Sequence, residues 1–246
     1  MLLKDFFIFI KKVISLFLFL FNPRKQAVET NLEKIGITKH KRRLAFQTYY
    51  NLFNAYFTLF LHTVLKKSPK LIIHNEEYIK EGKIFVSIHY GPWDMALRLV
   101  RKKYPFVSVV GKRDFLSILR EKHGLKIIYS TDGFGKIVDV AKHERVAIML
   151  DRTFNEKGLF IPVGRSCLKI SRAATILARR LREDMFFITA KDKESTIEIF
   201  IDKIPYGSFQ SMVEKIKEHI SVMLLNHPEY WFNFFAKWKQ EGRMCR

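Results

Sequence analysis

From residue 71 onward, apolar runs alternate with amphipathic segments, and this alternation constrains the fold more than any other feature of the chain. Short apolar runs predict strands at residues 71–74, 83–89, 106–110, 126–129, 145–151, 159–162, 185–190 and 196–203. The remaining periodicity predicts helices at residues 93–103, 114–123, 134–143, 169–182, 209–226 and 229–239. Strands that alternate with helices usually pair in parallel. The sequence therefore predicts an α/β fold with a mostly parallel sheet flanked by helices.

The stretch from Ile84 to Asp94 brings two reactive side chains to the end of one predicted strand. Its apolar run ends at His89, and the turn Gly91-Pro92 leads into a helical segment that carries Asp94. In open α/β sheets, ligands bind beside the carboxyl ends of the strands. We therefore expect His89 to act as a general base and Asp94 to orient its ring. The spacing alone is a weak pattern, because an unrelated loop histidine and aspartate would also produce it.

A second strand end, at residues 106–110, is followed by Gly111-Lys112-Arg113-Asp114. The ammonium group of Lys112 and the guanidinium group of Arg113 are suited to holding a phosphate group. An ordinary helix start, with Asp114 as the N-cap, explains the same residues equally well.

A third strand end carries Asp151-Arg152 directly after the buried run of residues 146–150. A carboxylate at such a place is costly unless it is paired or functional. Arg152 and His89 are the two candidate partners, the second only if the two strand ends are neighbours. The small-residue segment that follows, residues 169–178, contains Ser171, which we interpret as a helix cap and not as a nucleophile.

The first 21 residues are the most apolar part of the chain. The uninterrupted part, Val13–Phe21, is shorter than the roughly 20 residues that span a bilayer, and charged residues interrupt the rest. A helix lying in the membrane interface fits this pattern best, whereas a spanning helix and a helix packed on the protein remain alternatives. We expect an anchor at residues 1–22, a helical segment at 23–67 and a catalytic α/β domain at 68–246. Aromatic residues at helical spacing in the second segment predict packing on the core, or the wall of an acyl-chain groove or membrane face.

Composition indicates the class of partner and excludes several chemistries. The net charge of +20, from 44 basic and 24 acidic residues, favours an anionic membrane, nucleic acid or an acidic carrier protein. Two cysteines, Cys167 and Cys245, predict no disulfide framework and a reduced setting. The sequence contains no phosphate-binding glycine loop, nucleophile elbow or zinc spacing. We therefore expect neither a cofactor nor a metal.

Several motifs resemble one enzyme family. The block His89-Tyr-Gly-Pro-Trp-Asp94 is similar to the signature of the glycerolipid and lysophospholipid acyltransferase superfamily. More narrowly, it resembles the late lipid A biosynthesis (lauroyl/myristoyl) acyltransferases of bacteria, where His-x-Gly-Asn-Trp-Glu is typical. Further similar blocks are Asp151-Arg152 with Gly158 and Gly164, the tail His227–Lys239, and an N-terminal region that contains Arg24 and Asn31. The chain departs from the family pattern at Pro162-Val163-Gly164, where Phe-Phe-Gly is expected, and at Lys237, which replaces an arginine.

This resemblance implies a glycerolipid acyltransferase-like fold and transfer of a fatty acyl chain from an acyl carrier protein or CoA thioester to a lipid hydroxyl. It implies His89 and Asp94 as catalytic residues, and Arg113, Lys112, Asp151, Arg152, Gly164 and Arg165 as substrate-binding residues. The most probable acceptor is a lipid A precursor, with a lysophospholipid or a glycolipid as the alternative. We expect a peripheral or single-pass protein on the cytoplasmic face of the bacterial inner membrane, with no nucleic-acid partner. A non-catalytic basic protein that binds membranes or nucleic acid is the remaining hypothesis.

Overall fold

The computed structural model describes residues 2–65, 68–111, 113–122, 124–153, 158–193, 196–232, 234–239 and 245. Within them a seven-stranded sheet has the strand order β1-β9-β8-β2-β5-β3-β4. Its strands are β1 (Lys70–His74), β2 (Ile84–Ser87), β3 (Phe106–Val110), β4 (Lys126–Tyr129), β5 (Arg145–Met149), β8 (Met185–Lys193) and β9 (Thr196–Ile204). Strands β8, β2, β5, β3 and β4 run parallel, whereas β9 runs antiparallel to β8 and β1 runs parallel to β9. The predicted α/β fold with a mostly parallel sheet is confirmed.

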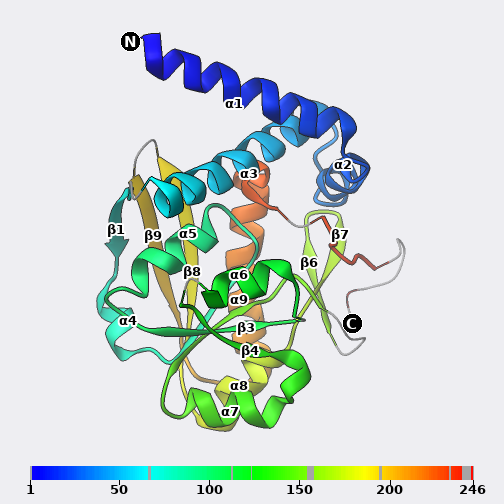
Figure 1. Cartoon of the computed structure of the whole chain (residues 1–246). Helices are drawn as coiled ribbons and strands as arrows, with labels where there is room; N and C mark the ends of the chain where they lie inside the picture. Colours follow the sequence, from blue (N-terminus) through cyan, green and yellow to red (C-terminus); the bar gives the residue numbers. More distant parts are fainter. Residues whose placement is uncertain are drawn as a thin grey trace.

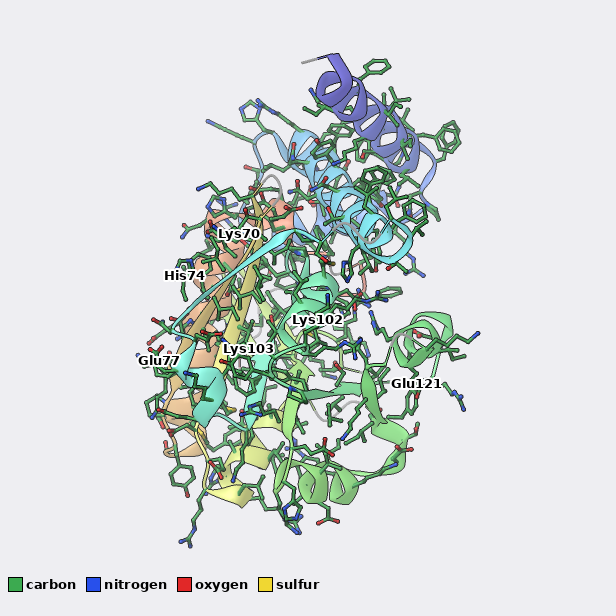
Figure 2. All side chains as sticks on the ribbon, turned by 60° about the vertical axis from the view of Figure 1, so that its left-hand side comes forward. Lys70, His74, Glu77, Lys102, Lys103 and Glu121 are labelled. Atoms are coloured by element: carbon green, nitrogen blue, oxygen red, sulfur yellow. A yellow bond between two sulfur atoms is a disulfide. The ribbon has the colours of Figure 1, made fainter. Side chains whose placement is uncertain are left out.

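The middle of the sheet brings two of the predicted strand ends together. β2 pairs in parallel with β5, with Ser87 opposite Met149, so the segments that follow the two strands leave the sheet side by side. β2 is buried along residues 84–86 because apolar clusters cover both faces of the sheet. At the outer edge lies β1, and Figure 2 shows its end residues, Lys70 and His74, along this edge.

Helices cover both faces of the sheet (Figure 1). They are α4 (Glu77–Glu81), α5 (Trp93–Val100), α6 (Phe115–Lys122), α7 (Phe134–Ala141), α8 (Ala173–Leu181) and α9 (Phe209–Asn226). One apolar cluster joins α4 and α5 to the sheet through residues such as Ile79, Met95 and Phe186. The other cluster joins α7, α8 and α9 to the opposite face. Alternate residues of the strands point to opposite faces, which explains why inner strands such as β2 and β8 contribute to both clusters.

Three further helices form the N-terminal part: α1 (Leu2–Phe21), α2 (Lys25–Lys34) and α3 (Lys41–Val64). Figure 1 shows α1 lying along α3 at the end of the molecule opposite α7 and α8. Phe19 is buried against α3, with its ring centroid 5.7 Å from that of Tyr49. On the outer side, Phe9, Phe17 and Phe21 are 64%, 61% and 70% exposed. Within the part of the chain that the structure describes, no helix combines the length and the apolar content needed to cross a bilayer.

Two predicted helices differ from the structure, and the first difference is a small hairpin that lies beside the main sheet. β6 (Leu159–Val163) pairs with β7 (Ser166–Ile170) in antiparallel fashion, so the helix expected from residue 169 begins only at Ala173 as α8. The helix expected at residues 229–239 is also wrong. Among the described residues of this range, a short 3-10 turn, η2 (Pro228–Tyr230), is the only helical element. Beyond it, Trp231 and Trp238 make β-bridges to Tyr90 and Leu168. We refer to residues 231–239 as the C-terminal strap.

The expectation about the two cysteines is wrong as well. Cys167 on β7 forms a disulfide bond with Cys245. The strap brings the end of the chain back to β7, where the backbone N–H of Lys239 donates to the carbonyl of Cys167 at 3.0 Å. A separation of 78 residues along the sequence is therefore bridged in space by long-range pairing, which the spacing of the cysteines does not reveal.

Candidate active site

His89 and Asp151 form a buried pair where β2 and β5 end. The Nδ1 atom of His89 lies 2.7 Å from Oδ1 of Asp151, and the backbone N–H of His89 donates to the same oxygen at 3.1 Å. The other carboxylate oxygen accepts the indole N–H of Trp231 at 2.8 Å. Three donors thus hold the carboxylate in place. Because Nδ1 is bound to Asp151, Nε2 is the ring nitrogen available to a ligand.

Asp151 carries its negative charge in a buried position, since its side chain is 0% exposed. Burial alone raises the pKa of a carboxyl group, but the opposing effects of His89, the Trp231 N–H and Arg152 hold the pKa of Asp151 below its ordinary value. A charged carboxylate beside Nδ1 stabilises the imidazolium that forms when Nε2 accepts a proton from a reactant. Of the two candidate partners for Asp151, His89 is the one that contacts it directly.

The loop that carries His89 is fixed by the C-terminal strap. The N–H of Phe232 donates to the carbonyl of His89 at 2.7 Å, and the N–H of Gly91 donates to the carbonyl of Tyr230 at 2.9 Å. Gly91 has a φ of +63°, and a Cβ atom at this position would lie 2.1 Å from the carbonyl oxygen of Ala190. Only glycine fits this turn, because both the backbone angle and the contact exclude a side chain.

Asp94 does not orient His89, which corrects the expectation drawn from the sequence. Its carboxylate forms a bidentate ion pair with Arg120 of α6, with distances of 2.8 Å from Nε to Oδ1 and 2.9 Å from Nη2 to Oδ2. Asp94 lies in the first turn of helix α5, so this helix sets its position and the preceding Gly91-Pro92 loop does not. The guanidinium of Arg120 also lies 4.6 Å from the ring centroid of Trp93. Although burial acts against it, the Asp94 carboxylate raises the pKa of Arg120.

A cavity of about 790 Å³ opens beside His89, within the range of roughly 300–1,000 Å³ typical of ligand sites. Polar and charged groups line it near the strand ends: His89, Asp94, Arg113, Arg120 and Arg152. Apolar side chains line the rest, among them Leu59, Ile79, Phe85, Val100, Phe106 and Ile199. The cavity therefore joins a polar site at the carboxyl ends of the strands to an apolar interior.

The predicted basic residues divide between cavity and surface. Arg152 lines the cavity, and its Nη2 donates to the carbonyl of Phe232 at 3.1 Å. Arg113 also lines the cavity, with a side chain that is 69% exposed and lies 4.0 Å from the carboxylate of Glu121. Lys112 lies outside the described residues. Next to Arg113, Asp114 caps α6 by accepting the N–H of Ser117 at 2.7 Å, so the helix-cap interpretation of this residue is confirmed.

Gly164 and Arg165 do not line the cavity, in contrast to the expectation that they bind substrate. Gly164 is in the β6–β7 turn with a φ of +58°, and a Cβ atom there would lie 2.1 Å from the carbonyl oxygen of Ile35. The N–H of Arg165 donates to the carbonyl of Lys34 at 3.2 Å. Both residues pack the hairpin against the end of α2, which is a structural role.

Two residues of the site were not assigned a role from the sequence, and a third, Tyr56, was expected only as part of the aromatic face that packs on the core or forms the wall of an acyl-chain groove. Arg120 neutralises Asp94, Trp231 holds Asp151, and Tyr56 of α3 lines the cavity. The aromatic face of α3 was the only signal for Tyr56. The tail motif contained Trp231 but gave no indication of its partner. Ser171 accepts the N–H of Ala173 at 3.3 Å just before α8, whose N-cap residue is Arg172. In the described parts of the chain, no group of three or more His, Cys, Asp and Glu side chains could hold a metal ion.

Comparison with known proteins shows similarity to a protein family and to solved structures. Residues 65–240 match the family model described as bacterial lipid A biosynthesis acyltransferase. Among solved structures, the 1-acyl-sn-glycerophosphate (LPA) acyltransferase PlsC from Thermotoga maritima is similar, with a TM-score of 0.43 and 10% sequence identity. The similarity covers 91% of this chain and 99% of that chain. No curated protein matches the sequence.

Proposed function

Because the chain belongs to the bacterial lipid A biosynthesis acyltransferase family, we propose that it transfers a fatty acyl chain from a thioester to a hydroxyl group of a lipid A precursor, at the cavity beside His89. The contact that carries this proposal is the 2.7 Å hydrogen bond between His89 and Asp151. It leaves Nε2 of the imidazole available at the wall of a cavity that is polar at one end and apolar at the other.

The proposed reaction uses His89 first as a base and then as an acid. Nε2 takes the proton of the acceptor hydroxyl while the oxygen attacks the thioester carbonyl carbon. When the tetrahedral intermediate collapses, the carbon–sulfur bond breaks and Nε2 returns the proton to the leaving thiolate. The charge of Asp151 stabilises the imidazolium between these two steps. The products are an ester and a free thiol.

Asp94 has a different role in this proposal. Its ion pair with Arg120 fixes one wall of the cavity at the start of α5. Backbone N–H groups of the turn do not serve as an oxyanion hole, because those of Tyr90, Gly91 and Trp93 already donate to carbonyl groups of the protein.

The apolar interior of the cavity suits the fatty acyl chain. Its lining residues come from α3, α4, α5 and the sheet, and Phe85 and Phe106 pack edge to face at 4.9 Å between ring centroids. Removing an alkyl chain from water into such surroundings is favourable by about 0.8 kcal/mol for each methylene group. The donor in this proposal is an acyl carrier protein or CoA thioester, and the net charge of +20 complements either anionic donor.

The exposed apolar face of α1 supports attachment to the cytoplasmic face of the inner membrane. Leu16 and Leu20 are 47% and 44% exposed in addition to the phenylalanines of this helix. A helix with such a face binds in the plane of the membrane interface. The lipid acceptor would then reach the cavity from the surface to which α1 is bound.

The test compares His89→Ala with wild-type protein in an assay with an acyl carrier protein thioester and a lipid A precursor. We expect a loss of kcat of roughly 10²-fold or more. Near-normal turnover of His89→Ala would contradict the assignment. Lipid mass spectrometry of a host with and without the gene identifies the acceptor: an acyl-sized mass shift on lipid A supports the proposal, and a shift on a phospholipid or glycolipid replaces it.

A further inference from the structure

Two arginines from distant segments lie against the ring of Phe235, which lines the cavity. The Cζ atom of Arg24 lies 3.9 Å from the ring centroid of Phe235, and the Cζ atom of Arg152 lies 5.2 Å from the same centroid. Arg24 directly precedes α2, whereas Arg152 follows β5. Arg152 and Phe235 line the cavity in which the substrates are proposed to bind, and Arg24 contacts this wall of the cavity through the Phe235 ring.

In the described part of the chain, Arg24 and Arg152 form no ion pair with a carboxylate. The neighbouring Asp151 is occupied by His89. The Nε–H of Arg152 is buried without an acceptor, although Nη2 is held by the carbonyl of Phe232. Buried donors are almost always satisfied, so this N–H points to an acceptor that the described residues do not provide.

The electrostatic surroundings also favour an anion. Burial lowers the pKa of Arg152, Asp151 acts in the opposite direction, and repulsion from Arg120 and Arg24 lowers the pKa further. Arg152 is partly buried, whereas Arg24 is exposed, and two like charges this close to one ring repel each other unless a counter-charge is present. A bound anion would remove this repulsion and would satisfy the free donor.

We propose that Arg24 and Arg152 together bind a phosphate group of a substrate beside Phe235. A guanidinium offers two parallel N–H groups that match two phosphate oxygens, and the charge strengthens both hydrogen bonds. The inference rests on the proposed acyl-transfer function, because it assigns the phosphate to one of that reaction's substrates. It adds Arg24, from the N-terminal helices, to a site otherwise built on the sheet.

Two substrates carry a phosphate group that this subsite could hold. One is the lipid acceptor, through a headgroup phosphate, and the other is the donor, through the phosphodiester of its pantetheine arm. The position of Arg24 favours the lipid. It follows Phe21, the exposed apolar end of α1, so the subsite lies on the side of the cavity nearest the proposed membrane surface.

The first experiment measures KM and kcat of Arg24→Ala with an acceptor that carries a phosphate monoester and with the same acceptor after dephosphorylation. We expect KM for the phosphorylated acceptor to rise by roughly 10-fold or more, the effect of losing a charged hydrogen bond, with little change for the dephosphorylated one. Arg24→Lys should restore part of the loss. Arg179→Ala is the matched control, because it removes an exposed arginine from α8 at the opposite end of the molecule (Figure 1).

The outcomes separate the two sources. A rise in KM for the thioester donor, with the acceptor unaffected, would assign the phosphate to the donor and overturn the lipid assignment. Equal KM values for wild type and Arg24→Ala with all three substrates would overturn the subsite. A titration of inorganic phosphate against sodium chloride at the same ionic strength, read as a thermal shift, needs no turnover. If the chain transfers no acyl group but phosphate stabilises wild type more than Arg24→Ala, the subsite stands and the proposed function falls.

Discussion

The Nδ1 atom of His89 lies 2.7 Å from Oδ1 of Asp151, which is 62 positions later in the sequence. The aspartate five positions after the histidine, Asp94, is bound instead to Arg120. The carboxylate that orients the imidazole therefore comes from the neighbouring strand end and not from the same motif. This relationship makes Asp151 a positioning residue for the proposed base.

Replacing Asp151 with Asn should lower kcat strongly. The amide can no longer hold the charged imidazole, and in a comparable arrangement the loss of this carboxylate costs about 10⁴-fold. The matched variant is Asp94→Asn, which breaks the ion pair with Arg120 but leaves His89 held. We expect a smaller loss of kcat for Asp94→Asn, and a changed acidic limb of the kcat–pH profile only for Asp151→Asn. Equal profiles for the two variants would contradict the assignment.

Trp231→Phe removes the indole N–H that donates to Asp151 at 2.8 Å and keeps an aromatic ring in the core. We expect the free energy of unfolding to fall by about 1–3 kcal/mol, because a buried acceptor loses a partner. The pKa of Asp151 should rise and kcat should fall. Trp238→Phe is the control, since its indole donates to Asn31 at the same distance of 2.8 Å. For Trp238→Phe we expect a similar loss of stability, measured by denaturant unfolding, and an unchanged kcat, measured by turnover.

Gly91→Ala should prevent the turn after His89 from adopting its present backbone conformation. The new Cβ atom would lie 2.1 Å from the carbonyl oxygen of Ala190 at a φ of +63°, so both strain and overlap oppose it. We expect a loss of stability of more than about 1 kcal/mol, together with a loss of kcat. Gly135→Ala in α7 has no atom within 4 Å of the new Cβ and should stabilise the helix by up to about 1 kcal/mol. Thermal unfolding of both variants measures the difference, and equal Tm values would contradict the prediction.

Asp192 should make stability depend on pH. Burial raises its pKa from 3.8 to about 6, although Lys11 acts in the opposite direction. The folded state thus holds the proton more tightly than the unfolded state, so this contribution to stability is complete below pH 4 and is lost as the pH rises to about 6. The shift corresponds to on the order of 2–3 kcal/mol.

Asp192→Asn keeps the shape of the side chain and removes the titration. Asn54 donates to this carboxylate at 2.6 Å and can also donate to the amide oxygen. We expect the variant to be more stable than wild type above pH 7 and equally stable near pH 4, as measured by denaturant unfolding across this range. Glu77→Gln, at the start of α4, removes an exposed carboxylate and should leave the wild-type pH dependence in place. A difference between Asp192→Asn and wild type that stays constant with pH would contradict the prediction.

The sequence predicted the secondary structure well where local interactions decide it and poorly where contacts between residues distant in sequence decide it. Apolar runs placed the strands of the main sheet within a few residues, because burial on both faces requires nearly continuous apolar residues. The segments around β7 and the strap were predicted as helices. Their apolar residues fit a helical period, but their backbone groups pair with distant strands. Local periodicity contains no information about such partners.

The sequence alone determined the parallel sheet and the position of His89 at the end of a central strand, since both follow from hydrophobic pattern and chain direction. Tertiary structure decided which groups surround that histidine. Pairing of β2 with β5 selected Asp151 over Asp94, and the strap supplied Trp231. Tertiary structure also joined Cys167 to Cys245 and placed Arg24 and Arg152 against the same ring, that of Phe235. The physical reason is that a carboxylate, a thiol or a guanidinium acts on what lies within a few ångströms, and in a folded chain those neighbours are seldom neighbours in sequence.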